Sequence, residues 1–403
     1  MNKTIKLAVA GAVLSAASIA NAGIIIPAGE WTLDVNGNVN VYASMTNYDD
    51  NTEAAGGLSG AKTGTGADDK NQTIGTGLLP AWLGFTGTTR QNDLDVSFTI
   101  SMQPTTSDNA ASGDVEPPLF RQAFLTFGDA SWGSVKMGKD LGIFAGNAIL
   151  GDMTLLGVGS NAANSGQSTT LGGIGTGYIY PAWKGQITYT TPNMNGFQAK
   201  IALTNPNQSA VALITTTRQD QFGIEGAAEY SFTKGKIWVS GASYDQNVGT
   251  VSWDAQVMDI GATVNIGNAT LTGYYYSGEG VGSTLMGGQI TTIGGNDSGT
   301  DGLGNERDSD GGYIQATYVI PTGTKLGVAY GVSRLDTATN DTVANRVLDE
   351  NSRWTVGAYH PLTKHLNLVA EYNAIESKDH GAGATAGVTA ESDTVSLGAI
   401  LFF

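Results

Sequence analysis

The chain has 403 residues; only 14% of them are charged, whereas 40% are hydrophobic and 57 residues are glycine. Soluble domains carry about 25% charged residues and about 7% glycine, and the absence of cysteine excludes disulfides and cysteine-based metal sites. The formal net charge of −16 argues against nucleic-acid binding, and the length fits either two or three domains or one large all-β barrel.

Residues 1–22 are predicted to be a secretory signal peptide. Lys3 and Lys6 provide a positive start, an apolar run of small residues follows to position 20, and Ala22 supplies a small residue at the cleavage site. An N-terminal anchor helix is the alternative, although the apolar run is too short to cross a bilayer. We therefore expect an exported protein with a single domain over residues 23–403.

The clearest strand signal lies between residues 93 and 103. Polar and apolar residues alternate there without a break, and the apolar face consists of Leu94, Val96, Phe98, Ile100 and Met102. A period of two is typical of a β-strand with one apolar and one polar face, and it excludes an amphipathic helix. The same pattern recurs along the chain to its last residues.

Sixteen strands are predicted in this way, and most have about 9–11 residues, the length that a tilted strand needs to cross a bilayer. Their approximate spans are 30–46, 80–88, 93–103, 119–128, 132–139, 179–191, 196–204, 220–232, 235–246, 253–266, 268–277, 311–320, 324–334, 352–360, 365–375 and 392–403.

The connections between the predicted strands alternate between short turns and mostly long loops. Residues 128–131 and 321–323 are short joins, whereas 47–79, 140–178 and 278–310 are long ones. This alternation is typical of outer-membrane barrels, which have tight periplasmic turns and long external loops. A soluble β-sandwich and a secreted glycine-rich adhesin are the alternatives. Because a closed barrel of sixteen strands has a water-filled lumen, its polar faces can point inward, and we predict an all-β, antiparallel transmembrane barrel.

Three stretches resemble the general, trimeric porins of Gram-negative outer membranes. They are residues 81–87, the hairpin over 120–140, and the C-terminal strand that ends in Phe403. The resemblance implies a homotrimer in outer-membrane lipid and lipopolysaccharide, and a third loop, here about 140–178, folded into the lumen. It also implies a channel for passive diffusion of small hydrophilic solutes and ions. Phe403 is similar to the terminal aromatic signal that the barrel-assembly machinery recognises.

The resemblance also implies a constriction, in which basic residues on the wall face acidic residues on the third loop. Arg121 matches the wall arginine of the fourth strand, and Lys139 matches the basic residue that closes the fifth strand. Asp152 matches the acidic position of the loop. Lys184, on the sixth strand, is expected to face inward as well, on a weaker alignment. The field between the two sides would orient polar solutes and select ions.

Trp82 departs from the family pattern, because the second strand usually carries an arginine at this position. The loop after Met153 is also apolar where the family often has a Pro-Glu pair. Both changes remove charge, so we expect a weaker transverse field and a narrow zone that favours less polar solutes. The alternative is that Trp82 belongs to an aromatic girdle and faces lipid.

Acidic residues gather in the predicted external loops. The first loop carries Asp49, Asp50, Glu53, Asp68 and Asp69, and the sixth carries a further group that includes Glu279 and Asp308. A negative mouth raises the local concentration of cations, which predicts a modest cation preference. Alternatively, these acids only solvate the loops or bridge lipopolysaccharide through divalent ions.

An enzymatic function is not predicted. The sequence has no phosphate-binding loop, metal triad or nucleophile elbow, and its three histidines all lie near the C-terminus. We expect no catalytic residue, no cofactor and no metal site. A structural or adhesive barrel with a plugged lumen, which conducts nothing, remains the alternative to a pore.

Overall fold

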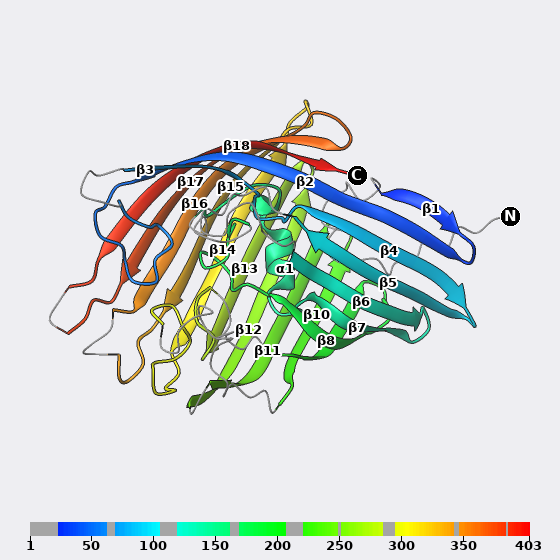
Figure 1. Ribbon diagram of the computed structural model, residues 1–403, viewed down its shortest axis with the longest axis horizontal. Coiled ribbons are helices and arrows are strands. Elements are labelled where there is room, and N and C mark those ends of the chain that lie inside the picture. The colour runs from blue at the N-terminus through cyan, green and yellow to red at the C-terminus, as the bar shows by residue number, and fades with distance from the viewer. Residues whose placement is uncertain are drawn as a thin grey trace.

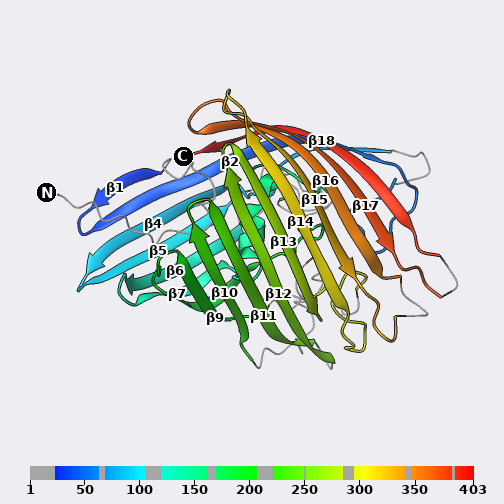
Figure 2. The ribbon, with the colours of Figure 1, turned by 180° about the vertical axis from the view of Figure 1, so that it is seen from behind.

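A computed structural model describes residues 23–62, 69–104, 119–161, 169–206, 221–248, 251–284, 295–341, 346–383 and 386–403. Its strands form one closed antiparallel barrel (Figures 1 and 2). The predicted signal peptide, residues 1–22, lies outside the described residues.

Sixteen strands form the wall of the barrel. They are β2 (Trp31–Tyr48), β4 (Trp82–Gln91), β5 (Leu94–Gln103), β6 (Leu119–Asp129), β7 (Gly133–Leu141), β8 (Trp183–Thr190), β9 (Phe197–Thr204), β10 (Gly223–Phe232), β11 (Gly235–Val248), β12 (Val251–Ile266), β13 (Ala269–Glu279), β14 (Asp308–Val319), β15 (Lys325–Leu335), β16 (Leu348–Pro361), β17 (Leu366–Asp379) and β18 (Thr389–Phe402). Each predicted span overlaps one of these strands, so the predicted strand number and class are confirmed.

The barrel closes where its last strand meets its first. β18 pairs with β2 in antiparallel register, with Leu401 opposite Val39. β9 also pairs with β10 in antiparallel register, so the ring continues without a gap between these two strands. Because every wall strand has two neighbours, the backbone of the wall has no long open edge that would lie unpaired in lipid.

Two short strands extend the seam and were not predicted. β1 (Ile24–Ala28) pairs with β2 beyond the end of β18, and β3 (Lys70–Gly75) pairs with the other end of β2, in line with β4. Between β3 and β4, residues 76–81 leave the wall and turn inward. Asn40 of β2 holds this segment, since its side chain accepts from the Gly77 amide and donates to the Leu79 carbonyl.

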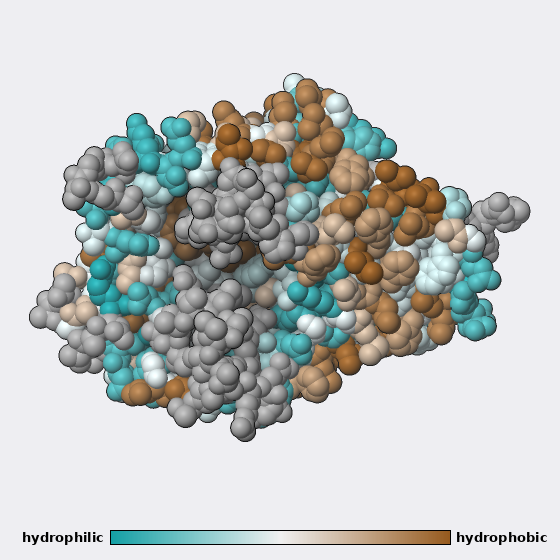
Figure 3. All heavy atoms as spheres, viewed as in Figure 1, coloured by the Kyte–Doolittle hydropathy of each residue, from teal (hydrophilic) through white to brown (hydrophobic). Residues whose placement is uncertain are grey.

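The two faces of the wall differ in polarity. On β18, Leu397 is 54% exposed on the outer face, whereas Ser396 is fully buried on the inner face. On β5, Ile100 is exposed while Ser97 and Ser101 are buried, as the alternation predicts. Apolar side chains gather over β2 and β4 to β7, between the polar loops at one end and the polar turns at the other (Figure 3). This distribution suits a barrel with lipid outside and polar groups inside.

Short turns join the strands at one end of the barrel, and long connections lie at the other end. The described residues include one α-helix, α1 (Gly146–Gly151), and one 3-10 helix, η1 (Met153–Leu156). Neither is long enough to cross a membrane, and the same holds for helices anywhere in the described part of the chain.

Candidate functional site

The connection between β7 and β8 is described over residues 142–161 and 169–182, and these residues are called the inner loop below. It contains α1 and η1, and Figure 1 shows α1 within the ring of strands. Hydrogen bonds tie it to inward side chains of distant strands. The Ala145 amide donates to Asp259 of β12 at 3.2 Å, and the Met153 amide donates to Gln315 of β14 at 2.9 Å. The loop therefore contacts inward side chains of β12 and β14.

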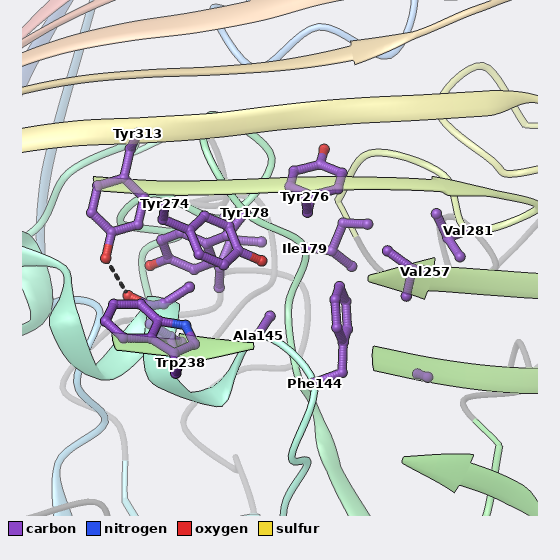
Figure 4. Packing of buried hydrophobic residues seen from close by; sticks show 14 of the residues in the cluster. Phe144, Ala145, Tyr178, Ile179, Trp238, Val257, Tyr274, Tyr276, Val281 and Tyr313 are labelled. Carbon is purple, nitrogen blue, oxygen red and sulfur yellow. Dashed lines mark hydrogen bonds between the residues drawn. The ribbon is translucent and has the colours of Figure 1, made fainter. Parts of the chain in front are cut away.

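A cluster of aromatic side chains packs one side of the inner loop against the wall. Tyr274 and Tyr276 of β13, Tyr313 of β14 and Trp238 of β11 are all buried against the loop (Figure 4). The Tyr313 hydroxyl donates to the Ala148 carbonyl at 2.8 Å, which fixes α1. Large buried aromatic surfaces contribute strongly to packing, so this side of the lumen is filled rather than open.

Lys184 and Glu225 form a buried ion pair on the inner wall. The Lys184 Nζ lies 2.6 Å from a Glu225 oxygen and 2.7 Å from the Tyr244 hydroxyl, and both charged side chains are almost fully buried. Glu225 also accepts hydrogen bonds from the backbone amides of Ile143 and Phe144 at the start of the inner loop. Lys184 faces inward. It is not exposed to the lumen, because it neutralises Glu225, the carboxylate that binds the start of the inner loop.

Asp152 is the acidic residue of the inner loop, and it is buried. One carboxylate oxygen accepts from the Thr154 amide at 2.8 Å, which caps η1. The other accepts from the Tyr178 hydroxyl at 2.8 Å and lies 3.8 Å from the guanidinium of Arg353 on β16. Burial and the nearby Asp152 charge raise the pKa of Tyr178 well above its usual value, so its hydroxyl keeps the proton that it donates.

Glu371 of β17 anchors the next part of the inner loop. Its carboxylate accepts from the amides of Val158 at 3.0 Å and Gly159 at 2.8 Å, and from the Tyr359 hydroxyl at 2.7 Å. Gly159 has φ +59, and a Cβ there would collide with Arg353, so glycine is required on both counts. Glu371 thus holds this stretch of the loop against β17.

Trp82 lies on the inner face of the wall. It is 7% exposed and packs in one cluster with Leu79, Ile400 and Phe402, against Leu155 and Leu156 of the inner loop. Its indole nitrogen points at the Asn36 side chain, 3.4 Å away. This position is incompatible with an outward aromatic girdle. The cluster also explains why the C-terminal strand has apolar residues on its otherwise polar face.

Arg121 lies at a β-bulge in β6, where the register with β5 shifts between Ser101 and Gln103. Its backbone amide donates to the Gln103 side chain at 3.0 Å. Burial raises the pKa of Tyr180, at the end of the inner loop, and the positive charge of Arg121 opposes this rise. The charge of Arg121 therefore acts on Tyr180 of the inner loop, and Arg121 is half-buried.

Lys139 differs from the expectation. It shares a face of β7 with Met137, which is 39% exposed on the outer surface, whereas its neighbour Asp140 is buried inside. Its Nζ donates to the Phe120 carbonyl at 2.9 Å. Because alternate residues of a strand point to opposite faces, Lys139 lies outside the lumen, and Lys136 is the inward lysine of this strand.

Several inward charges were missed by the sequence analysis. Arg353, Glu371 and Glu225 all occupy polar positions of strands that were predicted correctly. Their positions in the alternating pattern could have revealed them, since a charge on the polar face of a transmembrane strand must point into the lumen. Which loop atoms they contact could not be deduced, because those partners are 80 or more residues away for Glu225 and over 200 for Glu371.

Comparison with known proteins adds the family and the fold. The model of the Gram-negative porin family matches residues 7–380. A search of curated proteins found no match. Among solved structures, the anion-selective porin from Comamonas acidovorans is 17% identical, with a TM-score of 0.63, and the alignment covers 93% of this chain and all of that one.

Two further solved structures share this architecture. The outer-membrane channel DcaP of Acinetobacter baumannii is 14% identical with a TM-score of 0.67, over 95% of this chain and all of that one. OmpF of Salmonella typhi, solved in complex with daunomycin, is 15% identical with a TM-score of 0.61, over 94% of this chain and all of that one. At these identities the likeness concerns the fold.

Proposed function

The chain belongs to the family of Gram-negative porins, and from that premise we propose that it forms a water-filled channel for passive diffusion of small hydrophilic solutes and ions. As a porin with a closed barrel, it is a multi-pass protein of the outer membrane. The observation that supports diffusion is the polar inner face of the wall. The inner loop, which is bonded to this face, would narrow the lumen. We infer that transport needs no covalent chemistry, only size exclusion and electrostatics along the lumen.

The constriction that we propose lies where the inner loop approaches β4 to β6. Arg121 provides the basic side, and Trp82 covers the apolar side. Asp152 and Lys184 do not line the constriction themselves. Each is buried in an ion pair that fixes the inner loop. Lys139 has no part in this constriction, since it lies on the outer face of β7.

Reconstitution of the purified protein in planar bilayers tests the channel directly. A pore gives discrete conductance steps in potassium chloride, whereas a structural or adhesive barrel plugged by its inner loop carries no current. Lipase and protease assays on the same preparation address the enzymatic alternative.

We further propose that the protein is a homotrimer that the barrel-assembly machinery inserts by recognising Phe403. A porin-fold neighbour, OmpT of Vibrio cholerae, was solved in a trimer form, at 15% identity and a TM-score of 0.57. Phe403 exchanges two backbone hydrogen bonds with Gly37 at the seam of the barrel. The mass of the folded protein in detergent, by light scattering, distinguishes a trimer from a monomer.

A modest cation preference is expected from the external loops. Asp49, Glu53 and Glu279 are exposed, and the charge of the whole chain is −16. Asp297 and Asp301 of the sixth loop are buried, so they do not contribute freely to the mouth. Reversal potentials in a potassium chloride gradient measure the preference, and a potential of the sign given by anion flow would overturn it.

Replacing Trp82 with arginine is expected to lower the permeability for less polar solutes relative to polar ones of equal size. The new charge would break the apolar contact of Trp82 with Leu155 and Leu156 and restore a field across the constriction. Liposome swelling with size-matched solutes measures the ratio. Trp132→Arg, at an exposed turn, is the matched control. An unchanged ratio in Trp82→Arg would count against a role in solute preference.

A further inference from the structure

Three lysines point into the lumen from neighbouring strands of one wall. Lys136 of β7 lies on the same face as the buried Asp140, and Lys200 of β9 alternates with Ile201, which is 58% exposed outside. Lys236 of β11 shares its face with the buried Trp238, over which its Nζ lies at 5.1 Å from the ring centre. All three lysines are half-buried, so part of each side chain is exposed.

The register places these lysines around two intervening strands. Lys136 pairs with Thr188 of β8, and Thr190 of the same strand pairs with Lys200. Neighbouring strands lie about 4.8 Å apart and a strand rises about 3.4 Å per residue, so two strand spacings and the two-residue offset separate the backbones of Lys136 and Lys200 by about 12 Å. That distance is within reach of two extended lysine side chains that approach one small ligand.

On the other side of Lys200, β10 contributes Glu229 between Lys200 and Lys236. Lys200 pairs with Ala227 and Lys236 with Ser231, so Glu229 is the diagonal neighbour of both. Asn147 of α1 joins this group from the inner loop. It accepts from the Lys236 Nζ at 2.6 Å and points its amide at Glu229, 3.4 Å away.

The charges of this wall are not balanced. Lys136 has a salt bridge to Asp140 at 2.5 Å, and Lys236 is held by the neutral Asn147. Among the described residues, no carboxylate lies within salt-bridge distance of the Lys200 Nζ, although Glu229 and Asp140 act on it from further away and Lys136 repels it. Three ammonium groups thus face two carboxylates, and the surplus is centred on Lys200.

We propose that Lys200, flanked by Lys136 and Lys236, forms a binding site inside the channel for a small dianion of the phosphate or dicarboxylate type. This inference rests on the proposed channel function and adds a ligand class to it. The reason is electrostatic. A surplus of positive charge on a wall with few counter-charges attracts mobile anions, and an anion with two charges gains about twice as much as chloride.

The site gives the channel two zones of opposite sign. Cations collect at the acidic external mouth, while anions are held at the lysines on the wall beneath α1. Lysine suits this role because its compact charge sits on a flexible stem, so it attracts anions without locking them in one geometry. A passing dianion would bind briefly, leave, and reduce the chloride current while bound.

The test uses single channels of the folded protein in potassium chloride, with phosphate or succinate added at mildly alkaline pH. Each dianion is expected to reduce the current in a concentration-dependent way. Lys200→Gln is expected to raise the half-blocking concentration about fivefold or more, because it removes the central charge. Lys200→Arg keeps the charge and is expected to retain the block.

Lys139→Gln is the matched control, since it removes the same charge from the outer face of β7 and is expected to leave the block unchanged. Equal block in wild type and Lys200→Gln, or an equal loss in Lys139→Gln, would overturn the site. A loss confined to phosphate or to succinate supports the site and assigns its ligand. Heat-dependent gel mobility verifies that each variant is folded, and Lys236→Gln provides a second variant.

The channel and the site fail in different ways. If the wild-type protein conducts but is not blocked by either dianion, the proposed channel stands and the proposed anion site is overturned. A protein without current loses the channel, and in that case calorimetric titration of the detergent-folded barrel with phosphate still measures the site. Binding that Lys200→Gln weakens supports it, and the absence of binding overturns it.

Discussion

Replacing Lys184 with methionine is expected to destabilise the barrel by about 3–5 kcal/mol. The substitution leaves the Glu225 carboxylate buried without its cation, and an uncompensated buried charge is costly. Glu225 also holds the amides of Ile143 and Phe144, so the start of the inner loop is expected to loosen with it. The melting temperature, from heat-dependent gel mobility, is expected to fall by about 5–10 °C.

A double variant distinguishes the lost pair from lost packing. Lys184→Met combined with Glu225→Gln removes both charges, and replacing a buried pair with neutral groups often costs little. The double variant is therefore expected to be more stable than Lys184→Met alone. Lys234→Met, in the exposed turn before β11, is the control and is expected to behave as wild type. A double variant that melts below the single one would contradict the pairing argument.

Replacing Asp152 with alanine is expected to cost about 3–5 kcal/mol and to make the channel noisier and more conductive. The change removes the cap of η1 and leaves the buried guanidinium of Arg353 without its nearby carboxylate. Two nitrogens of Arg353 already have no hydrogen-bond partner among the described residues, so no alternative partner is at hand. The inner loop would then lose its hold on β16.

Single-channel recording and gel mobility measure both consequences of Asp152→Ala. Asp152→Asn retains an oxygen for the Thr154 amide but not the charge, so it is expected to lie between wild type and Asp152→Ala. Asp254→Ala, on an exposed position of β12, is the control. A steady wild-type conductance together with an unchanged melting temperature would show that Asp152 does not restrain the loop.

The wall of the barrel could be predicted from the sequence because the pattern that marks each strand lies in consecutive residues. Each strand must present apolar side chains to lipid and polar ones to the lumen, so the alternation appears in ten consecutive residues, as from Leu94 to Gln103. β1 and β3 escaped prediction because they are short. β3 in particular, Lys70–Gly75, carries four polar residues and a glycine around one isoleucine, which leaves no apolar face to recognise.

The site was less predictable, since its contacts join residues that are distant in sequence. Trp82 was placed in the narrow zone because it replaces a charge in a family pattern, but its partners Ile400 and Phe402 are more than 300 residues away. The prediction for Lys139 was wrong because a match to the family motif gives the position of a residue along the strand but not the face of the strand to which its side chain points. The parity of Met137 and Asp140 on the same strand decides the face instead.

The seam between β18 and β2 has a consequence for how the barrel forms. Ser44 bonds to Ser396 across this seam, 352 residues apart, and Thr46 bonds to Thr394 in the same way. Contacts of such sequence separation form slowly, because the intervening chain must be ordered first. The ring therefore stays open until β18 pairs with β2. Until then a partly formed sheet has two unpaired edges that can pair with other chains, so the unfolded polypeptide must be kept from self-association before the barrel closes.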